Sequence, residues 1–390
     1  MIPRYAPTYK ITDLLNGLML TSNPDIENQL CARLRSIYNA KHVFLFGSAR
    51  EAIYAILKAH NRSGRVLIPA YNCIVVPEAI RFAGYTIAFV DIDSQSLNMT
   101  AESVEKAITP DVRAILLTHL FGIPCDIDEI LYVLRKQDIL IIEDAAPAMG
   151  AKYKGHLVGC LGDAGVISFH STKIISAEVG GALLTNNEKL AFRVKELLKE
   201  ASAPENTWML FVKALSRKLV TNQRIYGFTH LGYRLLRGEK TYEILSPQTK
   251  NGKFLSLCSP FACALVIIQL ERLKWNLERR RSVARIYQSE LSRLSNLSTP
   301  IISYSCNPAW IQFPIRVEDK WAFYKYMQRN NVDVTWTYRY SCSESFGLNG
   351  YPNALETAKT VLGLPTSPNL STDDALHISD VVKKFPTITQ

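Results

Sequence analysis

Between residues 43 and 142 the chain alternates short apolar runs with segments of helical periodicity. The expected strands cover 43–46, 66–68, 86–90, 114–117 and 139–142, and the expected helices between them cover 49–58, 75–82, 101–107 and 127–136. Strands separated by helices in this way pair in parallel, because each helix carries the chain back to the same end of the sheet. The pattern therefore predicts an α/β fold, with a mostly parallel central sheet wrapped by helices.

Polar side chains follow the ends of several of these strands. Ser48, Tyr71, His119 and Asp144 come at or just after four strand ends, and Lys173 follows another apolar run. In parallel sheets, ligands bind at the edge where the carboxyl ends of the strands lie together. We therefore expect these five side chains to converge on one site.

The stretch from 141 to 185 carries most of the chemistry. It places Glu143 and Asp144 at the end of one strand, and Lys173 among hydroxyl-bearing residues after the next. Pyridoxal phosphate needs a lysine for a Schiff base, a carboxylate for its ring nitrogen, and hydroxyls and amides for its phosphate. A buried Asp–Lys pair in an ordinary α/β domain fits the same spacing equally well, so the residues alone leave both interpretations open.

Composition places the chain among globular enzymes. Of its 390 residues, 47% are apolar and 21% are charged. The eight cysteines include no Cys-x-x-Cys pair, which disfavours a metal site and a disulfide framework. Without a signal-peptide layout, or a run of about 18 apolar residues, we expect a cytoplasmic protein.

The formal net charge of +10 indicates an anionic partner. The candidates are an anionic substrate, a membrane surface and nucleic acid. We expect no nucleic acid, because the chain has no helix-turn-helix, zinc-finger or RNP pattern.

Several motifs together resemble the DegT/DnrJ/EryC1/StrS family of sugar aminotransferases. They are EDAAPAMGAKYKG (143–155), VGCLGDAGVISFHSTK (158–173) and GGALLTNN (180–187). Further matching segments keep the family order at 48–57, 68–93, 114–130, 269–291 and 351–385. The resemblance covers most of the chain apart from 200–255, and it implies a fold-type-I enzyme that uses pyridoxal 5'-phosphate, usually as a homodimer.

The resemblance assigns cofactor contacts to individual residues. Lys173 matches the Schiff-base lysine that also moves the proton, and Asp144 matches the carboxylate that pairs with the pyridine nitrogen. Ser168 matches the serine that binds the phosphate. The turn Ser48–Ala49–Arg50 begins a helix, and its free backbone amides are expected to bind the same phosphate. Some relatives carry histidine in place of the lysine and are sugar dehydratases, so Lys173 favours amino transfer.

Three positions near the cofactor depart from the family or have two interpretations. The family stacks an aromatic ring on the cofactor, where strict register places Cys73; we favour Tyr71, the nearest aromatic residue. His119 lies in the family's H-x-x-G pattern and either contacts the cofactor or makes a structural hydrogen bond. Pro147 replaces a Gln or His that contacts the ring hydroxyl, and proline has no donor for it.

A larger departure lies near residue 250. The family's GYN-x-R segment, which reaches the active site of the partner subunit, is replaced by NGKFLSLCSPFACAL (251–265). Asn251 is only a loose substitute for the family asparagine. The departure leaves the identity of the acceptor open.

The implied reaction is a two-stage amino transfer. An amino acid, expected to be glutamate, gives the amino group, and a keto-sugar, expected to be nucleotide-linked, receives it. One alternative is a pyridoxal-phosphate enzyme with another acceptor, an aminocyclitol precursor or a lipid-linked sugar. The other is a non-catalytic cofactor-binding regulator, which the intact Asp144 and Lys173 disfavour.

Two domains are expected. Residues 1–255 form the large cofactor-binding domain, and 256–390 form a linking helix and a small C-terminal α/β domain. Within the first, 201–255 is a basic helical insertion, with a helix at 208–220. It either packs on the large domain or at the dimer interface, or contacts a membrane through 208–240.

The flanking regions carry weaker signals. Residues 1–40 are expected to form an irregular arm and one helix at 25–38. A long amphipathic helix is expected at 260–294, with strands at 311–317 and 332–336 after it.

Overall fold

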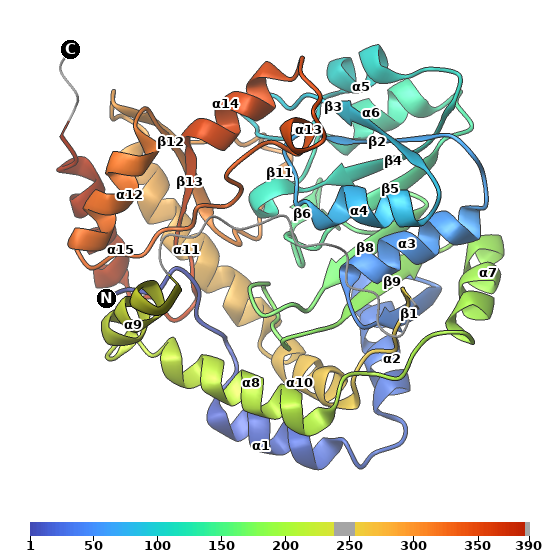
Figure 1. Cartoon of the computed structure of the whole chain (residues 1–390), viewed down its shortest axis with the longest axis horizontal. Coiled ribbons are helices and arrows are strands. Elements are labelled where there is room, and N and C mark those ends of the chain that lie inside the picture. The colour runs from blue at the N-terminus through green and yellow to red at the C-terminus, as the bar shows by residue number, and fades with distance from the viewer. Residues whose placement is uncertain (238–253, 387–390) are drawn as a thin grey trace.

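The computed structural model describes residues 1–237 and 254–386, which are built around a seven-stranded sheet (Figure 1). The strand order is β1-β9-β8-β5-β4-β2-β3. These strands are β1 (His42–Phe46), β2 (Arg65–Pro69), β3 (Thr86–Val90), β4 (Val112–Thr118), β5 (Leu140–Asp144), β8 (Ala164–Ser168) and β9 (Gly181–Thr185). Within this sheet β9 alone runs opposite to the others, so the other six strands end at one edge. The predicted α/β fold with a mostly parallel sheet is confirmed.

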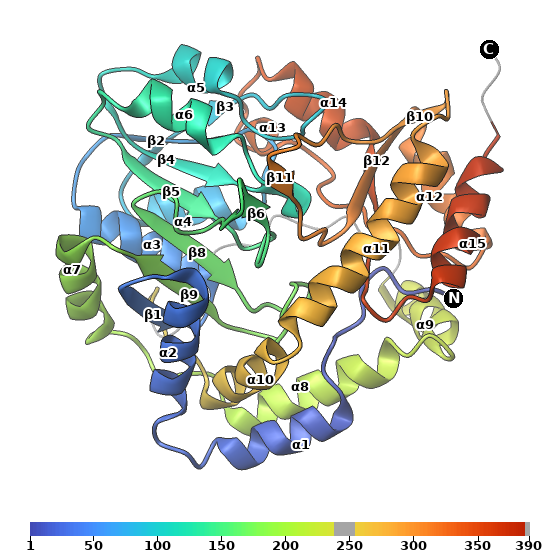
Figure 2. The same ribbon diagram turned by 180° about the vertical axis from the view of Figure 1, so that it is seen from behind.

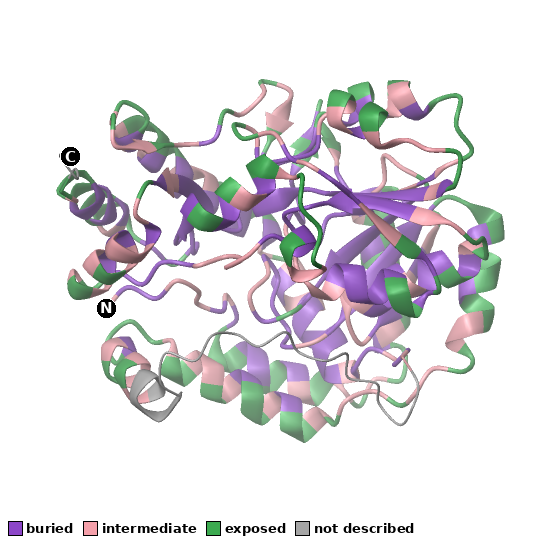
Figure 3. Cartoon of the chain, turned by 45° about the horizontal axis from the view of Figure 1, so that its top comes forward, coloured by how far each residue is buried: buried purple, intermediate pink, exposed green. Residues whose placement is uncertain are grey.

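Helices cover both faces of the sheet. Each face forms its own hydrophobic core, because successive side chains of a strand point to opposite faces. In β2, Val66 and Ile68 belong to one core, whereas Leu67 belongs to the other. The helices of the first face are α3 (Ala49–His60), α4 (Val75–Phe82) and α7 (Glu188–Leu198). Those of the second face are α2 (Ile26–Tyr38), α5 (Ala101–Ala107), α6 (Ile127–Leu134) and α10 (Pro260–Leu270). Figure 3 shows that buried residues concentrate along the sheet and on the helix sides that face it.

The C-terminal part forms a smaller sheet. After α11 (Leu273–Leu291), β12 (Phe313–Val317) pairs antiparallel with β10 (Leu297–Ser298) and β13 (Val361–Leu364). The surrounding helices are α12 (Lys320–Arg329), α13 (Cys342–Ser345), α14 (Pro352–Thr360) and α15 (Thr372–Lys383). A third sheet connects the two parts of the chain, because β11 (Cys306–Asn307) pairs with the hairpin of β6 (Lys152–Tyr153) and β7 (His156–Leu157).

The described part of the insertion forms two helices, α8 (Thr207–Val220) and α9 (Tyr226–Arg237). α1 (Ile11–Leu20) packs against α8 and α10. Figures 1 and 2 show α1 and α8 side by side along one edge of the molecule. Residues 238–240 of the predicted membrane-contact segment lie outside the described residues.

Three expectations about single elements are wrong. α1 was not predicted, because its exposed side is as apolar as its buried side. The single helix at 260–294 is two helices, α10 and α11, since Arg272 leaves helical geometry and its guanidinium pairs with Asp13 of α1. Residues 332–336 make only isolated bridges, so their alternating pattern reflects burial of Val332 and Val334.

Lys320 provides a test of the small sheet's packing. Its buried ammonium donates to the Ala358 carbonyl at 2.8 Å and lies 4.8 Å from the ring centroid of Trp336. Burial, with the nearby charge of Arg339 adding to it, lowers the pKa of Lys320 from 10.5 to about 7. Between these values the unfolded chain binds more protons than the folded chain, so the contribution of Lys320 to stability rises with pH.

We therefore expect Lys320→Met to gain stability relative to the wild type. The gain in free energy of unfolding should be larger at about pH 6 than at about pH 9, by roughly 1–3 kcal/mol. Urea denaturation of both proteins measures it. A difference that does not change with pH would contradict the lowered pKa.

Candidate active site

Asp144 ends β5 and is buried at the edge where the parallel strands end. Its Oδ1 accepts from the Ala146 amide at 3.0 Å, and Thr118 Oγ1 donates to its Oδ2 over a longer 3.4 Å. Asn72 Nδ2 donates to Thr118 Oγ1 at 2.9 Å. Burial raises the pKa of Asp144, and the positive charge of Lys173 opposes that rise. Asp144 is thus oriented by the protein while lying close enough to Lys173 to be influenced by its charge.

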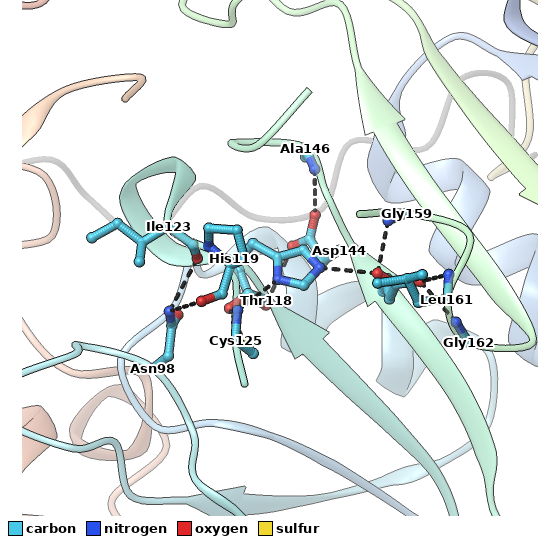
Figure 4. A network of polar contacts seen from close by, with 12 residues as sticks. Asn98, Thr118, His119, Ile123, Cys125, Asp144, Ala146, Gly159, Leu161 and Gly162 are labelled. Atoms are coloured by element: carbon cyan, nitrogen blue, oxygen red, sulfur yellow. Dashed lines mark hydrogen bonds and ion pairs between the residues drawn. The ribbon is translucent and has the colours of Figure 1, made fainter. Parts of the chain in front are cut away.

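The neighbouring carboxylate, Glu143, has a structural role, and Figure 4 labels its partners His119, Gly159, Leu161 and Gly162. Three backbone amides of the 159–162 turn donate to it, including Gly159 at 2.7 Å and Gly162 at 2.8 Å. His119 Nε2 lies 3.2 Å from the same carboxylate. Glu143 is fully buried, and these donors compensate its charge.

Both ring nitrogens of His119 are used inside the protein. Nδ1 accepts from the Cys125 amide at 3.1 Å, so the proton is on Nε2, which donates to Glu143. Of the two roles expected for His119, the structural hydrogen bond is the one that this geometry supplies.

Lys173 lies in the loop after β8. Its amide donates to the His170 carbonyl at 2.9 Å, and the His170 amide donates to Ser168 Oγ at 3.3 Å. Asn276 of α11 donates to the next carbonyl, that of Ile174, at 2.8 Å. The loop is therefore fixed, whereas the Lys173 ammonium donates no hydrogen bond within the described ranges and stays available.

The start of α3 lies against the ends of β8 and β9. Ser48 bridges to Gly180, and Gly181 pairs with Ser168. A Cβ on Gly181 would lie 2.4 Å from the amide nitrogen of Ala49, so only glycine permits this approach. The approach brings Ser168 and the first amides of α3 to one place.

The first turn of α3 is capped by its own side chains. Ser48 Oγ accepts from the Glu51 amide at 3.3 Å and donates to Glu51 Oε1 at 3.0 Å. The amides of Ala49 and Arg50 have no partner within the helix, as at any helix start. The Arg50 guanidinium lies 3.9 Å from Glu78 and its carbon 5.5 Å from the Phe254 ring centroid.

The segment that replaces GYN-x-R is attached to this chain's own α3. Ser256 donates to Glu51 Oε2 from its amide at 2.6 Å and from its hydroxyl at 2.9 Å. The Gly47 amide donates to the Ser256 carbonyl at 2.8 Å, and Ser202 pairs with the other side of the segment. Asn251 lies outside the described residues.

The preference for Tyr71 over Cys73 is not supported. Tyr71 is fully buried, with its ring packed in the core against Phe121 and Tyr338 at centroid distances of 6.2 and 5.0 Å. Cys73 instead lines the neighbouring cavity. Burial raises the pKa of the Cys73 thiol, and the charges of Lys173 and Asp144 both act on it.

A cavity of about 660 Å³ opens beside Cys73. Its strand-edge wall includes Cys73, Ser171 and Thr172, whereas Asp144 and Lys173 are not among its lining residues. The insertion, the amino-terminal arm and the segment before α13 supply the other walls. Their residues include Arg4, Tyr5, Arg217, Tyr226, His230, Trp336, Tyr338 and Arg339. None of the described residues that line it is an aspartate or a glutamate.

Sequence reasoning missed the contribution of the insertion to this cavity. Arg217 Nε donates to both oxygens of Glu178, at 2.8 and 2.9 Å, which ties α8 to the loop that carries Lys173. Tyr226 donates to the buried Asp333 at 2.6 Å, and Arg4 lies 3.4 Å from the same carboxylate. The signal in the sequence was the run of basic and aromatic residues, whose placement required the tertiary fold.

We expect Glu143→Gln to destabilise the protein by roughly 2–4 kcal/mol, because the new amide group would face backbone donors in a buried site. Urea denaturation measures the loss. Glu129→Gln, at an exposed position of α6, is the matched control. A similar midpoint for both variants would contradict the structural role of Glu143.

Comparison with known proteins agrees with the motifs. The model of the DegT/DnrJ/EryC1/StrS aminotransferase family matches residues 7–383. The chain is 27% identical over 393 residues to spore coat polysaccharide biosynthesis protein SpsC of Bacillus subtilis, covering 96% of this chain and 92% of that one. It is 30% identical over 261 residues to GDP-perosamine synthase of Caulobacter vibrioides, covering 66% and 60% respectively.

A solved structure shares the fold. The aminotransferase TlmJ from Streptoalloteichus hindustanus superposes with a TM-score of 0.80 at 22% identity, over 98% of each chain. Together with the family match over almost the whole length, this places the protein among enzymes that depend on pyridoxal phosphate. The chain belongs to the DegT/DnrJ/EryC1/StrS family of sugar aminotransferases.

Proposed function

We propose that this protein moves an amino group from glutamate to a nucleotide-linked keto-sugar, in two stages, with pyridoxal 5'-phosphate as cofactor. The observation that carries the proposal is the proximity of Asp144 and Lys173, a buried carboxylate and an ammonium at one end of the sheet. The cofactor needs one group for its ring nitrogen and the other for its aldehyde. A lysine rather than a histidine at 173 supports amino transfer over dehydration.

The residues of the site fit the cofactor. Asp144 Oδ2 has only the long contact from Thr118 among the described residues, so a protonated ring nitrogen would complete its hydrogen bonding and offset the cost of burial. Ser168 and the first amides of α3 would hold the phosphate, and Gly181 leaves the space that this approach needs. Once bound, the cofactor supplies the electron sink for amino transfer. Lys173 would hold it, and its ε-amino group would take up and return the proton in each half of the transfer.

The cavity supports an anionic acceptor. Among the described residues, Arg4, Arg217 and Arg339 line it, and none of the described lining residues is acidic. Arg217 contacts Glu178 through Nε alone. Its two terminal guanidinium nitrogens make no hydrogen bond to the described residues, so they are available to a ligand. A guanidinium group can donate two parallel hydrogen bonds to the oxygens of one phosphate, and aromatic side chains stack on planar rings. A diphosphate joined to a base and a sugar matches this set of side chains.

Polar groups for the sugar are also present. Thr335 and Trp336 line the cavity, and the Thr335 hydroxyl and the Trp336 indole N–H are buried without a hydrogen-bond partner among the described residues. Unpaired buried donors are costly unless a ligand satisfies them. They are therefore candidates for hydrogen bonds to sugar hydroxyls.

A lipid-linked sugar is the second candidate acceptor. It is favoured by α8 and α9, which line the cavity and also expose large apolar side chains such as Leu219 and Phe228. A panel of keto-sugars offered with glutamate, with 2-oxoglutarate measured, separates the two candidates. Turnover of a nucleotide sugar supports the first; turnover of only the lipid-linked sugars supports the second. We propose that the protein is a homodimer in the cytoplasm.

We expect Lys173→Ala to abolish amino transfer and the visible absorbance band that bound pyridoxal phosphate gives to the wild type. Lys189→Ala, at an exposed position of α7, should keep both. Absorbance after gel filtration and a glutamate half-reaction assay are the measurements. A wild-type protein that binds the cofactor but never consumes glutamate would instead indicate a regulator.

We expect Arg217→Gln to raise KM for the nucleotide sugar roughly 10- to 100-fold, with much less change in kcat, because a charge-assisted contact to phosphate is lost. Arg285→Gln, at an exposed position of α11, is the control. Thermal unfolding checks that both variants are folded. An unchanged KM would remove Arg217 from acceptor binding.

A further inference from the structure

Three helices at one edge of the molecule expose apolar side chains, which we call the apolar rim. On α1 the rim consists of Ile11, Leu15, Met19 and Leu20. On α8 it consists of Trp208, Met209, Val212, Leu219 and Val220. Phe228 and Leu231 of α9 complete it. α1 and α8 lie side by side, and α9 follows α8 (Figures 1 and 2).

The rim is exposed because each helix packs with its opposite side. α8 buries Leu210 and Ala214, while Trp208 remains 63% exposed. Phe228 of α9 is 80% exposed. Monomeric proteins rarely leave so many large apolar side chains together in water, so a patch of this kind indicates a binding surface.

The charges around the rim favour an anionic partner. Residues 207–237 contain no aspartate or glutamate. Their basic residues are Lys213, Arg217, Lys218, Arg224, Arg234 and Arg237. A second copy of this chain is a poor occupant, because a two-fold contact would bring the same basic helices together. A bilayer with anionic headgroups satisfies the apolar and the basic residues at once.

We propose that α1, α8 and α9 dock this protein on the surface of a bilayer that contains anionic phospholipids. The apolar rim enters the boundary between headgroups and acyl chains, and the exposed Lys213 and Arg224 contact the phosphates. None of the helices in the described ranges is long and apolar enough to cross the bilayer, so the contact is peripheral. Since α8 and α9 also line the cavity, docking holds the cavity beside the membrane surface.

Vesicle flotation of the purified full chain tests the proposal without any substrate. The vesicles contain phosphatidylcholine alone, or phosphatidylcholine with phosphatidylglycerol. We expect binding to the anionic vesicles that weakens at high salt, and little binding to the neutral ones. Phe228→Glu should weaken binding roughly tenfold or more, because it removes a large apolar contact and adds a repelled charge.

Phe192→Glu is the matched control, because Phe192 of α7 is 68% exposed but lies outside the rim. It adds the same charge, so it should bind nearly as the wild type does. Quenching of tryptophan fluorescence by brominated lipids gives a second measure. The contribution of Trp208 is the difference in quenching between the wild type and Trp208→Phe. Absence of wild-type binding, equal loss in both glutamate variants, or absence of Trp208 quenching would overturn the proposal. So would a dimer in sedimentation that Phe228→Glu converts to monomers, because a second copy would then cover the rim.

Discussion

The site depends on two adjacent buried carboxylates at the end of β5, which differ in how many hydrogen bonds the protein donates to them. Glu143 is surrounded by donors, three backbone amides and His119, which fix the turn at 159–162 and the histidine together. Asp144 receives one good hydrogen bond and one long one, and burial raises its pKa. A buried charge with so few partners is costly, and Lys173 offsets part of that cost. One carboxylate thus stabilises the fold, while its neighbour keeps the capacity to bind a ligand.

Helices α8 and α9 of the insertion form part of the cavity wall. Arg217 joins α8 to Glu178, and Tyr226 joins α9 to Asp333, a residue that Arg4 of the amino-terminal arm also contacts. These contacts connect the insertion, the arm and the C-terminal part around one cavity. The segment at 254–258, where the family has GYN-x-R, meanwhile attaches to α3 through Ser256. The two departures seen in the sequence thus have different structural consequences: the insertion lines the cavity, and the segment at 254–258 packs on α3.

Local patterns were enough to predict the sheet, and they place the candidate site at the edge where its parallel strands end. Asp144 and Lys173 follow strands with strong apolar runs, and strand ends meet wherever a sheet is parallel. Prediction failed where burial did not follow periodicity: α1 is apolar on both sides, and residues 332–336 alternate without a ladder. Cys73 and Tyr71 are two residues apart on a loop, so only the packing of Tyr71 in the core distinguishes them. Arg217 and Tyr226 could not be assigned, because their partners are distant in sequence.

We propose that Lys173 lies within bonding reach of a cofactor whose ring nitrogen faces Asp144. Borohydride reduction of the protein incubated with pyridoxal phosphate fixes the cofactor to the amine it has joined, and peptide mass spectrometry locates that amine. We expect a single phosphopyridoxyl group on the peptide that contains Lys173. Labelling of other lysines with an unmodified Lys173, or no stable labelling, would contradict it.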